Sequence, residues 1–115
     1  MPSCALPPDR RIRRRGEFQR VFDGGRRAHG RYFTVIVLPQ SEGTTRLGIV
    51  ASRKLGGAVV RNRAKRLIRE IFRVQMSPKP CDLVIIPKRA AVGAKVADLT
   101  RDYLETLKRL GLSIL

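Results

Sequence analysis

The sequence has no tryptophan, only two cysteines, one histidine and nine acidic residues in 115 positions. Cys4 and Cys81 are far apart in the chain, which suits neither a disulfide framework nor a zinc site, so we expect a reducing, cytoplasmic setting. With His29 as its only histidine, the chain lacks a histidine-based acid–base pair. The phosphate-loop pattern GxxxxGK[ST] is also absent, which argues against a nucleotide-hydrolysing enzyme of that type.

Long hydrophobic runs are missing as well. No apolar stretch approaches the roughly 18 residues that a membrane span needs, and none follows the basic residues near the N-terminus, so we expect no membrane-spanning segment and no secretory signal. Hydrophobic residues still make up 43% of the chain, enough for a core. We therefore expect one domain over residues 1–115, with residues 1–8, which hold three prolines and no charge, as an irregular arm.

Positive charge is what the sequence has in excess. Lysine and arginine supply 25 cations, for a formal net charge of +16, and 19 of these cations are arginine. Arginine grips phosphate with a planar fork, although a genomic bias toward arginine codons would give the same ratio. Nine cations lie in residues 10–31 and eight in residues 53–73, and the run 9–15 is predicted to follow a surface or a ligand. Such concentration predicts a polyanionic partner: nucleic acid first, then an anionic membrane surface or acidic proteins.

Hydrophobic periodicity predicts six elements. Apolar residues at helical spacing indicate helices over 17–23, 58–75 and 96–110. Runs rich in β-branched residues indicate strands over 31–38 and 46–52, which we expect to pair as a hairpin, and an interior strand over 82–87. Helices and strands in this order predict an α/β (α+β) two-layer sandwich around one small mixed sheet.

The helix expected over 58–75 separates its side chains into two faces. At about 100° per residue, Val60, Leu67 and Ile71 fall on one side, which we expect to pack on the sheet. The opposite side is almost uniformly cationic, and Lys65, Arg69 and Arg73 repeat a like charge every four residues, which destabilises an isolated helix. A solvated charged face is the ordinary alternative. Glu70 is the one acid near this face, and the excess of like charges nevertheless favours an anionic ligand.

Two segments carry a resemblance to a known family. The run SRKLGGAVVRNRAKRLIREIFR over residues 52–73 and the run RRGEFQRVFDGGRR over residues 14–27 resemble the signatures of the bacterial ribonuclease P protein subunit. Length and element order agree, so the resemblance covers nearly the whole chain. It implies a protein that binds a catalytic RNA and the 5′ leader of precursor tRNA and assists endonucleolytic removal of the leader.

The resemblance implies further properties. The chemistry is expected in the RNA subunit, which requires magnesium, with no catalytic residue and no metal or cofactor site in the protein. The expected partners are the catalytic RNA and precursor tRNA, with no membrane partner, and the protein is expected to be a monomer in a 1:1 complex with the RNA. The fold is expected to be ribosomal protein S5 domain 2-like, with a left-handed βαβ crossover, an exception to the usual handedness.

The resemblance also implies two sets of binding residues. The set for the RNA subunit is Arg61, Asn62, Arg63, Lys65, Arg66, Arg69 and Arg73. The set for the leader is Phe18, Phe22, Phe33, Ile36, Arg53 and Lys54. Ile36 stands where relatives can carry a tyrosine, and Arg53 where many carry lysine. Two phenylalanines on one helix face are usually core, so we expect at least one of Phe18 and Phe22 to be partly exposed for stacking on a leader base.

Two other functions share some of these features. A ribosomal or other structural RNA-binding protein would have the same charge and fold class but would not require Phe18 or Phe22 beside a groove. A self-sufficient metal-dependent nuclease could use Asp98, Asp102 and Glu105, which share one face of the last predicted helix. Flanking cations make an ordinary mixed surface the simpler interpretation of that face.

Overall fold

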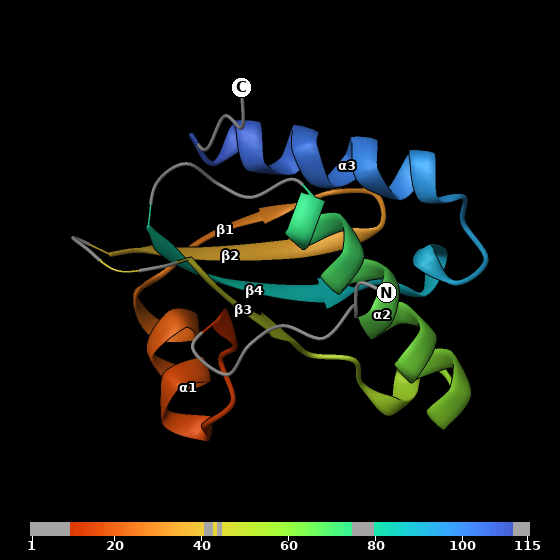
Figure 1. The fold of residues 1–115 in the computed structure, drawn as a ribbon, viewed down its shortest axis with the longest axis horizontal. Helices are drawn as coiled ribbons and strands as arrows, with labels where there is room; N and C mark the ends of the chain where they lie inside the picture. Colours follow the sequence, from red (N-terminus) through yellow and green to blue (C-terminus); the bar gives the residue numbers. More distant parts are fainter. Residues whose placement is uncertain (1–9, 41–42, 44, 75–79, 112–115) are drawn as a thin grey trace.

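The computed structural model describes residues 10–40, 43, 45–74 and 80–111, so the arm predicted over residues 1–8 lies outside the described residues. The elements follow one another as α1 (Arg15–Gly24), β1 (Arg26–His29), β2 (Phe33–Pro39), β3 (Arg46–Ile49), the 3₁₀ turn η2 (Arg53–Leu55), α2 (Ala58–Val74), β4 (Cys81–Pro87), the 3₁₀ turn η3 (Arg89–Ala91) and α3 (Val96–Arg109) (Figure 1). Each helix that the periodicity predicted is present.

The strands form one mixed sheet in the order β1-β2-β4-β3. β1 pairs with β2, and β2 with β4, in antiparallel fashion, whereas β3 and β4 are parallel and are joined through α2. The predicted fold class, a small mixed sheet with helices, is confirmed.

The hairpin predicted between residues 31–38 and 46–52 is wrong. β4 lies between β2 and β3, pairing Val35 with Ile85 on one side and Leu47 with Leu83 on the other. Six of the seven residues of β4 are buried, including the unbroken run from Cys81 to Ile85, so its apolar side chains gain most from a central position with both faces covered. Long-range burial therefore overrides the short connection between β2 and β3.

The sequence patterns did not predict β1. Its residues, Arg-Arg-Ala-His, show no alternation of apolar and polar side chains, and most of them are exposed. The strand lies at the edge of the sheet, where Arg26 pairs with Val37 and His29 with Thr34. Exposed arginines on an edge strand oppose pairing with another chain.

The two faces of the sheet have different covers (Figure 1). Val35, Leu83 and Ile85 pack with residues of α2 and α3 such as Phe72 and Tyr103 in the larger core cluster. The alternate positions on β2 and β4 form a smaller cluster with Val21 of α1 and with Ile12. Since α1 is short, the second face is covered only in part, which leaves room for a site beside α1.

Asp102 of α3 anchors the turn between β1 and β2. Its carboxylate accepts hydrogen bonds from the backbone N–H groups of Arg31 at 2.8 Å, Tyr32 at 2.8 Å and Phe33 at 3.3 Å. Gly30 makes this approach possible, because a Cβ at that position would lie 2.6 Å from Asp102 Oδ2. None of the helices in the described part of the chain is both long and apolar enough to cross a membrane.

Candidate nucleic-acid interface

Two aromatic rings stand side by side on α1. The ring centroids of Phe18 and Phe22 are 6.5 Å apart, and both side chains are only partly buried, which confirms the expectation that at least one is accessible. The Phe18 ring lies directly against Gly48 of β3, where a Cβ would come within 2.6 Å of Phe18 Cε1. A glycine in this strand thus makes room for the ring on the sheet.

An ionic cluster fixes the start of α1 relative to the sheet. Arg46 Nη1 donates to Glu17 Oε2 at 2.7 Å, while its Nη2 and Nε donate to Asp82 at 2.8 and 3.0 Å. Glu17 Oε1 also accepts from the backbone N–H groups of Arg13 and Arg14, at 3.3 and 3.2 Å. One guanidinium therefore connects α1, β3 and β4 immediately beside Phe18.

The charges in this cluster stabilise one another. The hydrogen bond from Arg46, followed by those from the backbone of Arg14 and Arg13, lowers the pKa of Glu17 from 4.5 to about 2. The hydrogen bond to Asp82, and to a smaller extent the one to Glu17, raises the pKa of Arg46 above its ordinary value. The pair between Glu17 and Arg46 is therefore ionised at any physiological pH.

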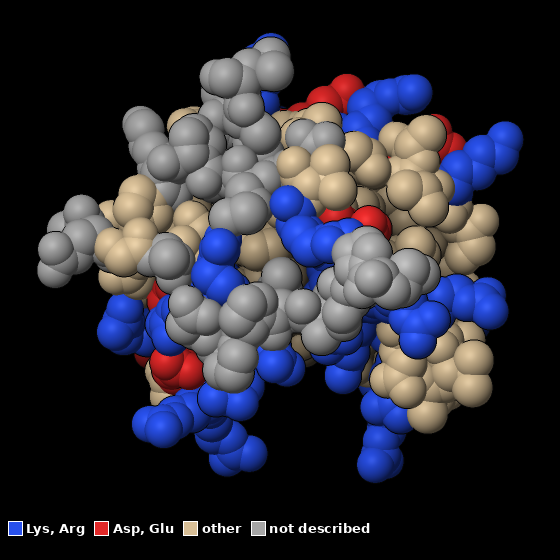
Figure 2. All heavy atoms as spheres, viewed as in Figure 1, with Lys and Arg blue, Asp and Glu red and all other residues tan. Residues whose placement is uncertain are grey.

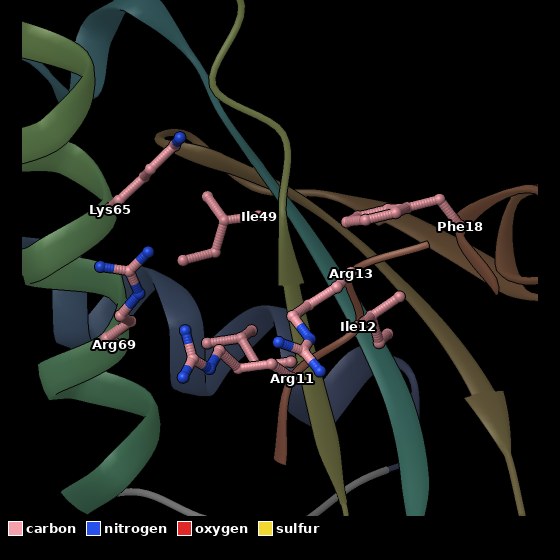
Figure 3. Close-up of a pocket in the computed structure, with 8 residues that line it drawn as sticks. Arg11, Ile12, Arg13, Phe18, Ile49, Lys65 and Arg69 are labelled. Carbon is pink, nitrogen blue, oxygen red and sulfur yellow. The ribbon is translucent and has the colours of Figure 1, made fainter. Parts of the chain in front are cut away.

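A cationic pocket opens between α1, β3 and α2 (Figure 3). We call it the basic cleft; its volume is about 150 Å³, and its lining residues are Arg11, Ile12, Arg13, Phe18, Leu47, Ile49, Lys65 and Arg69. Four of these side chains are apolar and four are cationic, and none is acidic. Apolar and aromatic surface beside cations is the combination that binds single-stranded nucleic acid, because bases stack while phosphates pair with the cations.

The predicted RNA-subunit residues of α2 lie in different surroundings, some in the basic cleft and some outside it. Lys65 and Arg69 line the basic cleft together with Phe18, so the two predicted sets meet there. Asn62, Arg63 and Arg66 are exposed outside it. Arg73 pairs with Glu70 at 3.0 Å, and the Nε of Arg61 is buried without a hydrogen-bond partner in the described structure. Lys and Arg side chains gather along the lower part of the view in Figure 2.

The predicted leader residues also differ in burial and location. Phe33 is 1% exposed and belongs to the core under α2 and α3, whereas Ile36 is 0% exposed and lies beneath α1. Neither side chain offers surface to a ligand in this structure. Arg53 and Lys54 are exposed on η2, and Lys54 lines a different pocket, which it shares with Lys88 and Arg89.

Sequence reasoning missed several residues of the interface. It noted the basic run that contains Arg11 and Arg13 but not its position beside Lys65 and Arg69. It did not identify Ile49 as a lining residue. It also did not find the role of Arg46, because Arg46 and its partner Asp82 are 36 residues apart in the sequence. The local signal available for Arg11 and Arg13 was charge alone.

The acidic side chains of α3 do not resemble a metal site. Both oxygens of Asp102 accept backbone hydrogen bonds from residues 31–33. Asp102, the central member of the set Asp98, Asp102 and Glu105, is therefore already engaged in the fold. Within the described ranges, no group of three or more His, Cys, Asp or Glu residues is placed to hold a metal ion.

The sheet, the basic cleft and the cationic face of α2 indicate a small nucleic-acid-binding protein. Comparison with known proteins identifies the family. The family model described as Ribonuclease P matches residues 6–111, and the chain belongs to this family.

Relatives and solved structures agree with this assignment. The chain is 44% identical to the ribonuclease P protein component of Desulfovibrio desulfuricans, over 91% of this chain and 83% of the relative, and 48% identical to that of Desulfotalea psychrophila, over 73% and 72%. The structure resembles the RNase P protein of Staphylococcus aureus, with a TM-score of 0.81 at 31% identity, over 90% of this chain and 96% of that one. It also resembles the RNase P protein from Thermotoga maritima, with a TM-score of 0.78 at 35% identity, over 86% and 96%.

Proposed function

We propose that this chain binds the catalytic RNA of ribonuclease P and the 5′ leader of precursor tRNA, and so assists the RNA in cutting off the leader. The observation that carries the proposal is the basic cleft, in which Phe18 lies beside cations from two separate parts of the chain. The cleft has the chemistry for an unpaired strand, and the exposed side of α2 has the chemistry for a phosphate backbone.

The proposed contacts follow the exposure of each residue. Phe18 and Phe22 offer partly open rings for stacking on leader bases, and Arg53 and Lys54 are exposed cations for its phosphates. Asn62, Arg63 and Arg66 contact the catalytic RNA from the open side of α2, where Asn62 adds a polar fork for sugars or base edges. The burial of Phe33 and Ile36 supports a role in holding the sheet under α1, α2 and α3 instead of a direct contact.

The protein contributes binding, and the RNA contributes the chemistry. Cations that neutralise phosphates reduce the repulsion between the catalytic RNA and its substrate, which lowers the concentration of magnesium that the complex needs. In this proposal the magnesium ions belong to the RNA-based holoenzyme, one protein joins one RNA, and the complex works in the cytoplasm.

Reconstitution tests this function directly. The purified protein alone should cleave nothing, whereas its addition to the catalytic RNA should accelerate cleavage of leader-bearing precursor tRNA at low magnesium. Phe18→Ala should reduce the preference for precursor over mature tRNA, since only the precursor has a base to stack on the ring. Failure of the wild-type protein to assist the RNA, together with its recovery in ribosomal fractions, would instead indicate a structural RNA-binding protein.

A further inference from the structure

Another pocket lies on the flank of α2 that faces away from the basic cleft. The N-terminal part of α2 forms one wall, and η3 with the residues that follow it forms the other (Figure 1). We call it the apolar pocket; its lining residues are Val59, Val60, Arg63, Ala64, Leu67, Ala91, Val92 and Gly93. Arg63 and Lys65 are two residues apart and therefore about 200° apart around the helix, which places the two pockets on different sides of α2.

The apolar pocket collects hydrophobic side chains that the fold does not bury. Among the described residues, the exposed large hydrophobic side chains are Val59 at 74%, Val74 at 65%, Val96 at 51% and Val92 at 45%. Two of them, Val59 and Val92, line this pocket. A valine in the first turn of a helix gains nothing from local propensity, because its branched side chain loses freedom there. Burial against another molecule is therefore the contribution that Val59 can make.

The floor of the apolar pocket is fixed by the core, whereas its mouth is open. Ala91 is 8% exposed and belongs to the larger core cluster, against which Leu67 also packs. Gly93 turns the chain after η3 with a φ of +79°, and a Cβ there would meet no atom within 4 Å. A preformed apolar hollow that opens to free space is suited to one anchoring side chain of a partner.

The size and the lining of the apolar pocket select the chemistry of its ligand. An apolar cavity of about 150 Å³ holds one benzene ring. The apolar pocket, at about 100 Å³, is too small to enclose a nucleobase but can take an aliphatic side chain. None of its described lining residues is aromatic, and Arg63 supplies the one polar side chain among them, so the polar edges of a base would lack partners. Leucine or methionine satisfies both limits.

The charge around the apolar pocket selects the kind of partner. Residues 52–69 and 83–97, which supply its walls, include no aspartate or glutamate. Arg63 is exposed on its rim, and none of the ion pairs among the described residues includes it. A second copy of the chain would bring the same cations and a net charge of +16, so the two copies would repel each other. An acidic partner is attracted instead.

We propose that the apolar pocket binds an acidic peptide segment of a protein partner, with one leucine or methionine side chain between Val59 and Val92 and a neighbouring carboxylate on Arg63. The inference goes beyond the proposed function, because it concerns the flank of α2 away from the basic cleft and does not require RNA. Arg63 is also among the contacts proposed for the catalytic RNA, so the peptide experiments use the full-length protein without that RNA.

The first test asks whether an apolar anchor matters. The probe is a fluorescein-labelled peptide in which two leucines alternate with aspartates, and the matched peptide has serine in place of both leucines. In fluorescence polarisation the leucine peptide should bind about tenfold more tightly or better, since the two peptides have the same charge. Equal affinities would overturn the proposal, because binding would then be general electrostatics. The absence of saturable binding up to about 1 mM would overturn it as well.

The second test uses matched variants of the protein. Val59→Ser should weaken binding of the leucine peptide about fivefold, whereas Val74→Ser, at an exposed valine of the other end of α2, should change it less than about twofold. Arg63→Gln should weaken it about fivefold at low salt and less at high salt, and Lys108→Gln on α3 is the control of equal charge. Thermal melting checks that the four variants are folded. Equal effects within both pairs would refute the site.

Nuclear magnetic resonance of the isotope-labelled protein locates the peptide. The largest changes in amide chemical shift should centre on Ala64, Ala91 and Gly93, which lie around the apolar pocket. Changes centred on Phe18 and Lys65 would place the peptide in the basic cleft and overturn the proposal.

The remaining outcomes separate this inference from the proposed function. Failure of the wild-type protein to assist the catalytic RNA removes the proposed function and leaves the peptide site. Val59→Ser should bind the catalytic RNA within about twofold of the wild type. A larger loss for that RNA, with peptide binding unchanged, would assign the apolar pocket to the RNA and refute the inference. A dimer of the wild-type protein that Val59→Ser abolishes in sedimentation would assign it to a second copy and refute it too.

Discussion

Arg46 Nη1 lies 2.7 Å from Glu17 Oε2, and this contact joins the first turn of α1 to the edge strand β3. The same guanidinium binds Asp82, whose side chain is 2% exposed. Phe18 follows Glu17 in the chain and rests on Gly48, two residues beyond Arg46. The geometry of the aromatic side of the basic cleft therefore depends on one arginine outside it.

Replacing Arg46 should destabilise the protein strongly. Arg46→Met leaves the buried Asp82 carboxylate without its main partner, and we expect a loss of about 3 kcal/mol in the free energy of unfolding, measured with urea. Arg20→Met is the control, because Arg20 is 62% exposed and reaches Asp82 only at 3.9 Å, so its loss should cost under about 1 kcal/mol. Equal costs would show that Arg46 is not the central contact.

The contribution of Glu17 should depend on pH in a defined direction. Because the folded pKa is lowered from 4.5 to about 2, the ionised carboxylate stabilises the fold above about pH 4.5, and this stabilisation is lost as the pH falls toward 2. Wild type and Glu17→Gln should therefore differ most in unfolding free energy near neutral pH and converge in acid. Thermal melting from pH 6 to 2 measures the difference, and a gap independent of pH would contradict the ion pair.

Gly48→Ala should disturb the aromatic side of the cleft. The added Cβ would lie 2.6 Å from the Phe18 ring, so the ring must move, at a cost of about 1–3 kcal/mol in stability. We also expect a smaller preference for precursor over mature tRNA in binding assays. Gly57→Ala is the matched control, since no atom lies within 4 Å of a Cβ there. If both variants keep the preference, the position of Phe18 is not important for the leader.

The part of the fold that could be predicted from sequence is the part governed by local patterns. α2 was predicted because its apolar and cationic positions repeat at helical spacing, and the apolar run of β4 indicated an interior strand. The order of the strands depends on pairings between distant segments, such as Leu47 with Leu83, which no local pattern reports. The hairpin prediction failed for this reason.

The candidate site shows the same division. The motifs assigned Phe18 to the leader and Lys65 and Arg69 to the RNA subunit, whereas the structure places all three around one cleft. Arg46 was not identified, because its function arises only where β3 and β4 bring it beside Asp82. Phe33 matched an aromatic position of the family, yet the alternation along β2 turns it away from the α1 face.

Variants on the open side of α2 test its assignment to the catalytic RNA. Arg63→Ala and Arg66→Ala should each weaken binding of that RNA by about 1–3 kcal/mol if the side chain contacts a phosphate. Filter binding at several salt concentrations should show a shallower salt dependence for each variant, because fewer counterions are released. Lys95→Ala, an exposed cation at the start of α3, is the control. Unchanged affinity in both α2 variants would refute the assignment.

Asp102→Asn should affect folding and not the magnesium requirement. The substitution removes a charge that accepts three backbone hydrogen bonds, so we expect a loss of about 1–3 kcal/mol in stability. Reconstituted cleavage should keep the magnesium dependence of the wild type, as it should for Glu105→Gln, an exposed neighbour on α3. A shift in that dependence for both variants would revive a metal role for the acidic residues of α3.

The central place of β4 has a consequence for how the protein is made. Synthesis proceeds from the N-terminus, so β1, β2, β3 and α2 leave the ribosome before the strand that must lie between β2 and β3. The β1–β2 hairpin has the contacts to form early, but β3 has only the single bridge from Arg11 to Leu47 until residues 81–87 arrive. Assembly of the edge that supports the cleft is therefore a late, non-local step. The nascent chain therefore exposes its cationic residues before the edge of the sheet that positions them around the basic cleft has formed.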